Sequence, residues 1–213
     1  MPTSHLYQLN EIIELIFETK PKTILDIGIG FGKFGFLSRE YLDIWGRESH
    51  DYRSRDVRID GIEVFKEYLT PVHNFIYDNI FIGNAIDVLP TLKIRYDLIL
   101  LIDVLEHFNF KEGEKIISEC IKRGRNIIIS TPLNIGNQGP SRGNIYESHK
   151  FQWRKKHFNT YPKKFFRSNK LSIICFLGDD YIIVKNKIKI NRSKIRSKLK
   201  KYYARVYKSV FNS

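Results

Sequence analysis

Three glycines at alternate positions follow an aspartate that ends a short apolar run. In the segment ILDIGIGFGKFG, Asp26 ends the run, and Gly28, Gly30 and Gly32 follow it at every second position. Glycine lets a backbone turn tightly and approach a ligand without a Cβ in the way, while a following helix presents free N–H groups. Gly30 and Gly32 also begin a GxGxxG match, the dinucleotide fingerprint, so the spacing alone leaves the ligand open.

Two carboxylates and two imidazoles form a second group that could do chemistry. Asp103, Glu106 and His107 lie in DVLEH after an apolar run, and His149 follows in YESHKFQW. If DVLEH forms a helical turn, its three polar side chains can face one point. The mixed oxygen and nitrogen donors would suit Mg²⁺, Mn²⁺ or Zn²⁺, and the alternative is a pocket wall without metal.

The glycine loop and the segments after it resemble the class I S-adenosylmethionine-dependent methyltransferases. Their DxGxGxG motif is matched at Asp26, Gly28, Gly30 and Gly32. The resemblance implies that the following residues bind the cofactor: Asp26 at its amino acid end, the three glycines around it, Glu63 at the ribose, Asn84 and Asp87 at the adenine, and Asp103.

Two departures from that family leave alternatives. A polar insertion over residues 43–57 lengthens the spacing between Asp26 and Glu63, so Asp60 is the alternative ribose ligand. Asn84 stands where an acid is commoner, although an amide oxygen can still accept from the adenine amino group.

The DVLEH turn and HKFQW together resemble the methyltransferases that modify the 3′-terminal ribose of small RNAs. That resemblance implies a divalent ion held by Asp103, Glu106, His107 and His149. It also makes His107, His149 and Asp103 the candidate catalytic residues, with either histidine as the base that removes the hydroxyl proton.

The elements that must position these residues alternate between strands and helices. A helix is expected over residues 6–20, and five short apolar runs, TILDIGI, RIDGIEVF, NIFIGN, YDLILLIDV and RNIIIST, are expected as strands. Runs this apolar are typical of a parallel sheet covered on both faces. We therefore expect an α/β fold, a doubly wound, Rossmann-like, seven-stranded and mostly parallel sheet. It should end in an antiparallel hairpin around Gly178, Asp179 and Asp180.

The formal charge of +13 is concentrated at the end of the chain. Every acid lies at or before Asp180, and residues 181–213 carry 11 Lys and Arg. We expect a domain over residues 1–190 and a basic amphipathic helix over 191–213. Residues 185–208 would contact a membrane surface or RNA, or the helix would pack on the domain or on another subunit.

These patterns predict a cytoplasmic protein, peripheral to the inner face of a membrane, with two buried free thiols at Cys120 and Cys175. The expected activity is methylation of a sugar hydroxyl on a glycan, a glycolipid precursor or a small molecule that is anionic. The alternatives are metal-dependent methylation of an RNA ribose, a non-catalytic cofactor-binding module and an NAD-dependent oxidoreductase.

Overall fold

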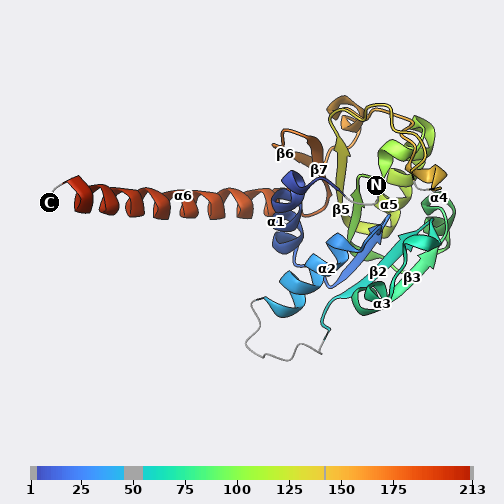
Figure 1. Ribbon diagram of the computed structural model, residues 1–213, viewed down its shortest axis with the longest axis horizontal. Coiled ribbons are helices and arrows are strands. Elements are labelled where there is room, and N and C mark those ends of the chain that lie inside the picture. Colours follow the sequence, from blue (N-terminus) through green and yellow to red (C-terminus); the bar gives the residue numbers. More distant parts are fainter. Residues whose placement is uncertain (1–3, 46–54, 142, 212–213) are drawn as a thin grey trace.

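Seven strands form one mixed sheet in the computed structural model, which describes residues 4–45, 55–141 and 143–211 (Figure 1). The strand order is β3-β2-β1-β4-β5-β7-β6. The strands span Thr23–Ile27 (β1), Arg58–Glu63 (β2), Asn79–Ile82 (β3), Tyr96–Ile102 (β4), Gly124–Pro132 (β5), Lys164–Arg167 (β6) and Ser172–Gly178 (β7). The first five are parallel, whereas β7 pairs antiparallel with both β5 and β6. The predicted fold class is confirmed.

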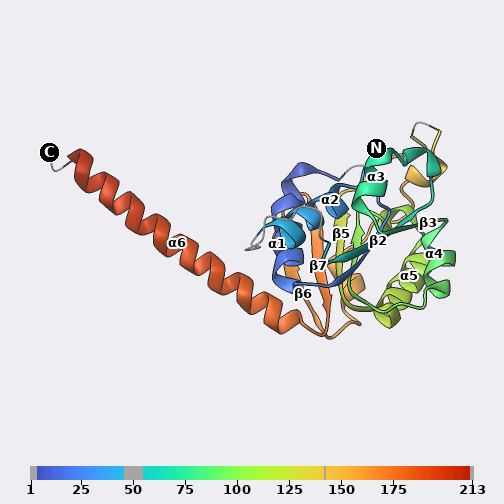
Figure 2. The ribbon, with the colours of Figure 1, turned by 90° about the horizontal axis from the view of Figure 1, so that it is seen from below.

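Helices cover both faces of this sheet (Figure 2). They span Leu9–Thr19 (α1), Lys33–Arg39 (α2), Pro71–Ile76 (α3), Ala85–Val88 (α4), Phe110–Arg123 (α5) and Tyr181–Phe211 (α6). Side chains of α1, α2, α3 and the start of α6 pack in one core, and those of α4 and α5 pack in the other. Neighbouring strand residues alternate between the two cores, with Ile24 in the first and Leu25 in the second, because successive strand side chains point to opposite faces. Cys120 and Cys175 are buried and unpaired, as predicted.

The antiparallel hairpin lies earlier in the chain than the turn signal indicates. It is formed by β6 and β7, with Phe165 opposite Phe176, and no pattern in the sequence predicted β6 as a strand. Residues 181–188, expected as its second strand, instead begin α6. Val184 and Ile188, four residues apart on one face of this helix, are buried.

The last helix begins before the predicted domain boundary at residue 191 and continues for 31 residues. Its first turns pack on the domain, and the rest extends away from it as a long arm (Figure 1). No described helix is long and apolar enough to span a membrane.

The polar insertion does not displace β2. Its central residues 46–54 lie outside the described residues, but the two ends are joined through Asp43. One carboxylate oxygen of Asp43 accepts the N–H groups of Asp56 and Val57, both at 3.0 Å, and the other accepts from Arg39 at 2.9 Å. Glu63 therefore keeps its place at the end of β2 despite the longer connection.

Candidate functional site

The loop between β1 and α2 depends on glycine at three alternate positions. Gly28, Gly30 and Gly32 have φ angles of 72°, 51° and 78°, which residues with a side chain rarely adopt. A Cβ on Gly28 would also lie 2.7 Å from a methyl carbon of Val104. Gly28 and Gly30 line a cavity of about 570 Å³, whereas Gly32 is not among its lining residues.

Glu63 lies at the end of β2 and is tied to the glycine loop. Its carboxylate accepts the N–H of Gly30 at 3.0 Å and the N–H of Phe65 at 2.9 Å. The side chain lines the cavity but is only 4% exposed, and this burial raises its pKa. The alternative, Asp60, is fully buried outside the cavity lining, where it accepts from Tyr96 at 2.7 Å. The geometry therefore favours Glu63 as the carboxylate available to a ligand.

Asp26 is a buried carboxyl group at the base of the same cavity wall. It is 3% exposed, and Tyr77 donates its hydroxyl to the carboxylate at 2.7 Å. Burial is the main reason why its pKa is raised from 3.8 to about 6, and the nearby Glu63 raises it further, while the Tyr77 hydrogen bond lowers it. A ligand that brings positive charge to this wall would offset the cost of the buried ionised carboxyl.

The two residues predicted beside the adenine have different positions. Asn84 lines the cavity and caps α4, because its side-chain oxygen accepts the N–H of Ile86 at 3.2 Å. Asp87 is exposed and is not among the lining residues of the cavity. The sequence match brings Asn84 to the site and leaves Asp87 outside it.

Asp103 lines the cavity at the end of β4 in a left-handed conformation, with φ of 53°. Its carboxylate accepts from Nε2 of Gln8 at 2.5 Å and from the hydroxyl of Ser130 at 3.1 Å. Gln8, the residue before α1, is fully buried, so it fixes the orientation of this carboxylate. No sequence motif indicates that Gln8 contacts the site, because its hydrogen-bond partners Asp103 and Ser130 follow it by more than 90 residues.

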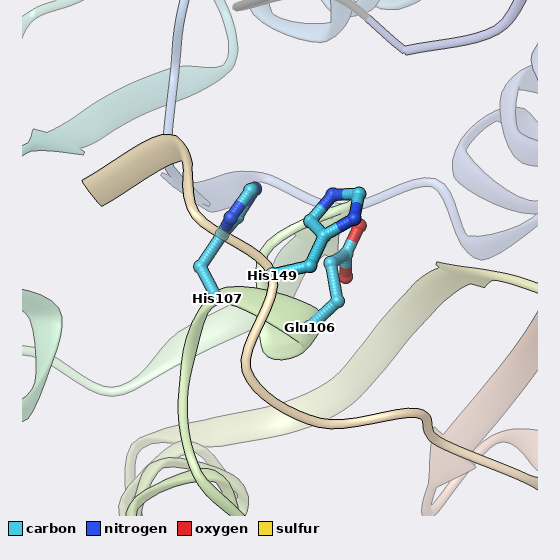
Figure 3. A group of neighbouring side chains, drawn as sticks. All are labelled: Glu106, His107 and His149. Atoms are coloured by element: carbon cyan, nitrogen blue, oxygen red, sulfur yellow. The ribbon is translucent and has the colours of Figure 1, made fainter. Parts of the chain in front are cut away.

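Three of the four predicted metal ligands come together, and Asp103 is not one of them. Glu106, His107 and His149 each offer a ligand atom within 4.8 Å of the other two (Figure 3). Glu106 and His107 lie in a short 3₁₀ turn after β4 (Leu105–His107), and His149 comes from the long loop after β5. The expected α-helical turn does not form, so Asp103 points to Gln8 and Ser130 instead.

The hydrogen bonds of both imidazoles leave the same ring nitrogen available. Nδ1 of His107 faces the carbonyl oxygen of Ser148 at 3.3 Å, and Nδ1 of His149 contacts the carbonyl oxygen of Ile135. A carbonyl only accepts, so each Nδ1 carries the proton and each Nε2 carries a lone pair. Such backbone hydrogen bonds commonly orient histidines that bind metals.

Glu106 is buried beside these histidines with one oxygen unsatisfied. Its side chain is 1% exposed, and Oε2 has no hydrogen-bond partner among the described residues. Burial and the nearby Asp103 raise its pKa well above the usual value, whereas burial lowers the pKa of His107. An unpartnered buried carboxyl oxygen is costly, so a cation or a donor from a ligand would stabilise this arrangement.

The long loop over residues 132–159 supplies one wall of the cavity. Asn144, Tyr146, Glu147 and Lys150 line it, whereas Trp153 is fully buried in the core, where its indole N–H donates to the carbonyl of Leu105 at 3.0 Å. Lys33, Tyr68 and Gln138 also line the cavity, although no motif predicted them as site residues. They come from segments without a recognisable motif, and only the fold brings them to the cavity.

Comparisons with known proteins give a consistent answer for the fold. No protein-family model and no curated protein sequence matches the chain. Among solved structures, the N-terminal domain of EvdMO1, crystallised in the presence of S-adenosylhomocysteine (SAH) and D-fucose, is similar with a TM-score of 0.56 and 13% identity over 83% of this chain and 84% of that one. A SAM-dependent methyltransferase from Archaeoglobus fulgidus has a TM-score of 0.57 and 15% identity over 81% of this chain and 91% of that one.

The methyltransferase domain of bacterial CtHen1 is also similar, with a TM-score of 0.54 and 16% identity. The match covers 81% of this chain and 98% of that domain. These likenesses, the parallel strand order with a reversed β7 and the cavity at the carboxyl ends of β1, β2 and β4 agree with one another. The chain therefore has the fold of the class I S-adenosylmethionine-dependent methyltransferases.

Proposed function

We propose that this protein is an S-adenosylmethionine-dependent O-methyltransferase whose acceptor is a sugar hydroxyl. The observation that carries the proposal is one cavity with two chemically different sides. Gly28, Gly30 and Glu63 line one side, and Glu106, His107 and His149 line the other. The volume of about 570 Å³ lies within the range of small-molecule sites and leaves room for a cofactor and part of an acceptor.

The cofactor side offers suitable groups for each part of S-adenosylmethionine. Glu63 can accept hydrogen bonds from two ribose hydroxyls, as a carboxylate has two oxygens. Asp26 lines the cavity just before the glycine loop, and the positive charge of the cofactor's amino acid end would favour its ionised form. Asn84 borders the adenine end. Methyl transfer from a sulfonium needs mainly an aligned acceptor oxygen, and the walls of the cavity would supply this alignment.

The other side of the cavity offers a base for the acceptor hydroxyl. A lone pair on Nε2 of His107 or His149 can take the hydroxyl proton as the oxygen attacks the methyl carbon. The bond from methyl carbon to sulfur breaks, and neutral SAH leaves. Lys150 on the same wall favours an acceptor with negative charge.

The structure of EvdMO1 with D-fucose supports a sugar acceptor as a second line of argument. A glycan, a glycolipid precursor or a small glycoside would each present such a hydroxyl.

Methylation of an RNA ribose with a divalent ion is the second candidate function. It is favoured by Glu106, His107 and His149, because each offers a ligand atom within 4.8 Å of the other two and Oε2 of Glu106 has no hydrogen-bond partner among the described residues. The ion would supply Lewis acidity that lowers the pKa of a bound hydroxyl and orients a vicinal diol. The protein's own part would be to orient both imidazoles through the carbonyls of Ser148 and Ile135.

Calorimetric titration with SAH, with NAD as control, tests the proposed cofactor. We expect micromolar binding of SAH and none of NAD. NAD binding without SAH binding would overturn the proposal in favour of an oxidoreductase. SAH binding without methyl transfer to any sugar or RNA acceptor would favour a non-catalytic module.

Titration with Mn²⁺ and Zn²⁺ separates the two candidate functions. If the ion belongs to the site, both wild type and His157→Ala should bind it, since His157 is not among the cavity-lining residues. His149→Ala should lose at least tenfold in metal affinity, and it should keep SAH binding. Metal affinity unchanged in His149→Ala would remove the metal from the site and leave the imidazoles as bases.

A further inference from the structure

The arm formed by α6 is anchored to the domain only at its beginning. Val184 and Ile188 are 1% and 2% exposed. Asn191 donates to Glu18 at 2.7 Å, and Arg192 forms an ion pair with Glu14 at 2.8 Å. From Arg192 through Tyr202 every described side chain is exposed, so the helix leaves the domain there (Figures 1 and 2).

The apolar face that anchors the helix continues beyond the domain. Ile195 follows Ile188 by seven residues and Leu199 follows Ile195 by four, the spacing that keeps side chains on one helical face. Yet Ile195 and Leu199 are 56% and 49% exposed. The apolar stripe is therefore buried where the helix packs on the domain and exposed beyond it. The apolar spacing continues, but no described part of the chain covers it.

Cations without acids surround this exposed stripe. Residues 181–213 hold 11 Lys and Arg and no Asp or Glu. Lys194, Arg196 and Lys198 are exposed and have no ion-pair partner among the described residues. Arg192 is different, because it forms an ion pair with Glu14 of the domain. The surface that covers the arm must therefore be negatively charged as well as able to accept apolar side chains.

Three kinds of partner can be separated on this basis. A second copy of the arm would bring two cationic helices together with no acid to pair them, so it is disfavoured by like-charge repulsion. A nucleic acid backbone would pair with the cations but would leave Ile195 and Leu199 in water. An anionic bilayer surface takes both, because lysine and arginine contact headgroups while the apolar stripe enters the interface.

We propose that residues 193–211 of α6 bind the surface of an anionic lipid membrane. The arm starts at the end of the sheet where the parallel strands begin, opposite the cavity. This is because β7 runs antiparallel to β5 and ends beside Asn126. From there it slants back, so that its free end lies on the side of the molecule toward which the carboxyl ends of the parallel strands point (Figure 2). This docking does not depend on the proposed methyl transfer.

Sedimentation of the full chain with lipid vesicles tests the proposal without cofactor or acceptor. We expect binding to phosphatidylcholine vesicles that contain phosphatidylglycerol and little binding to phosphatidylcholine alone. Ile195→Asp with Leu199→Asp should abolish binding. The matched control, Ile183→Asp with Ile190→Asp, changes two equally exposed residues of the same helix that lie off the stripe, and it should bind like wild type.

The charged flanks are tested by Lys194→Gln with Lys198→Gln. Each cation removed from an anionic surface should weaken binding about fivefold, so the pair should weaken it about 25-fold. Circular dichroism and SAH binding check that each variant is folded.

Two results would overturn the proposal. One is no binding of the wild type to anionic vesicles at low salt. The other is equal loss in the stripe variant and its off-stripe control. Tight binding to a single-stranded RNA that survives Ile195→Asp with Leu199→Asp, together with no vesicle binding, would assign the arm to nucleic acid instead.

Discussion

Replacing Asp26 by asparagine should make the protein more stable at neutral pH and worse at holding its cofactor. Asp26 is buried, and its pKa is raised from 3.8 to about 6. An acid whose pKa is higher in the folded state stabilises the fold only while it is protonated. That contribution is complete below pH 3.8 and is lost as the pH rises through about 6. A shift of this size corresponds to about 3 kcal/mol, at about 1.4 kcal/mol per pH unit.

Asparagine keeps the shape of the side chain and an acceptor for the Tyr77 hydroxyl, but it carries no charge. The free energy of unfolding of Asp26→Asn, relative to wild type, should therefore increase by about 3 kcal/mol between about pH 4 and pH 7. Urea unfolding followed by fluorescence at several pH values measures this difference. In the same variant, calorimetry should show weaker SAH binding, because asparagine lacks the negative charge proposed to face the amino acid end of the cofactor. The substitution would thus increase stability and decrease binding.

Tyr77→Phe provides a second check of the same reasoning. It removes the hydrogen bond that favours ionised Asp26, so the loss of stability should move to higher pH. A difference between Asp26→Asn and wild type that is the same at every pH would refute the claim that the buried carboxyl ionises in this window.

Three further substitutions test the elements that support the site. Gly113→Ala should destabilise the protein by about 1–3 kcal/mol, because the new Cβ would lie 2.4 Å from the buried Trp153 ring, whereas Gly139→Ala, with open space around it, should leave the thermal midpoint unchanged. Asn109→Ala should cost about 1 kcal/mol in urea unfolding, since its side chain caps α5 at 3.0 Å, and a serine there should restore most of the loss. Gln8→Ala should cost about 1–3 kcal/mol and weaken SAH binding, because it leaves Asp103 without its Gln8 donor; unchanged SAH affinity would show that this orientation does not matter.

Local patterns were sufficient for the fold class and for most of the cofactor side. The strands are short and apolar. Strands of a parallel sheet that is buried on both faces need such apolar runs, whatever the order of the strands in the sheet. The three glycines are needed because the backbone has positive φ angles at these positions. This is a local requirement, so the sequence of the loop is sufficient to predict it. Glu63 lies directly at the end of β2, and the parallel register brings it beside the loop that follows β1.

The candidate metal group was predicted only in part, because it joins two distant segments. Spacing placed Asp103, Glu106 and His107 on an assumed α-helical turn, but the chain forms a 3₁₀ turn after a left-handed residue. Asp103 therefore turns to Gln8, a partner 95 residues away that no local rule identifies. His149 joins the group because the backbone of the long loop bonds to the region of Glu106, with the N–H of Lys150 donating to its carbonyl at 2.7 Å.

The last part of the chain shows the same division between sequence and tertiary structure. Sequence alone determined that the tail is basic, free of acids and helical over its last residues. It did not determine that Tyr181–Phe211 is one helix, because the β-branched run after Gly178 suits a strand as well as a helix. Tertiary structure decided this, since β6 already occupies the free edge of β7, and the face of α1 offers Val184 and Ile188 a place to be buried. Local residues fix what each segment can form, whereas long-range packing selects which of those forms buries its apolar side chains.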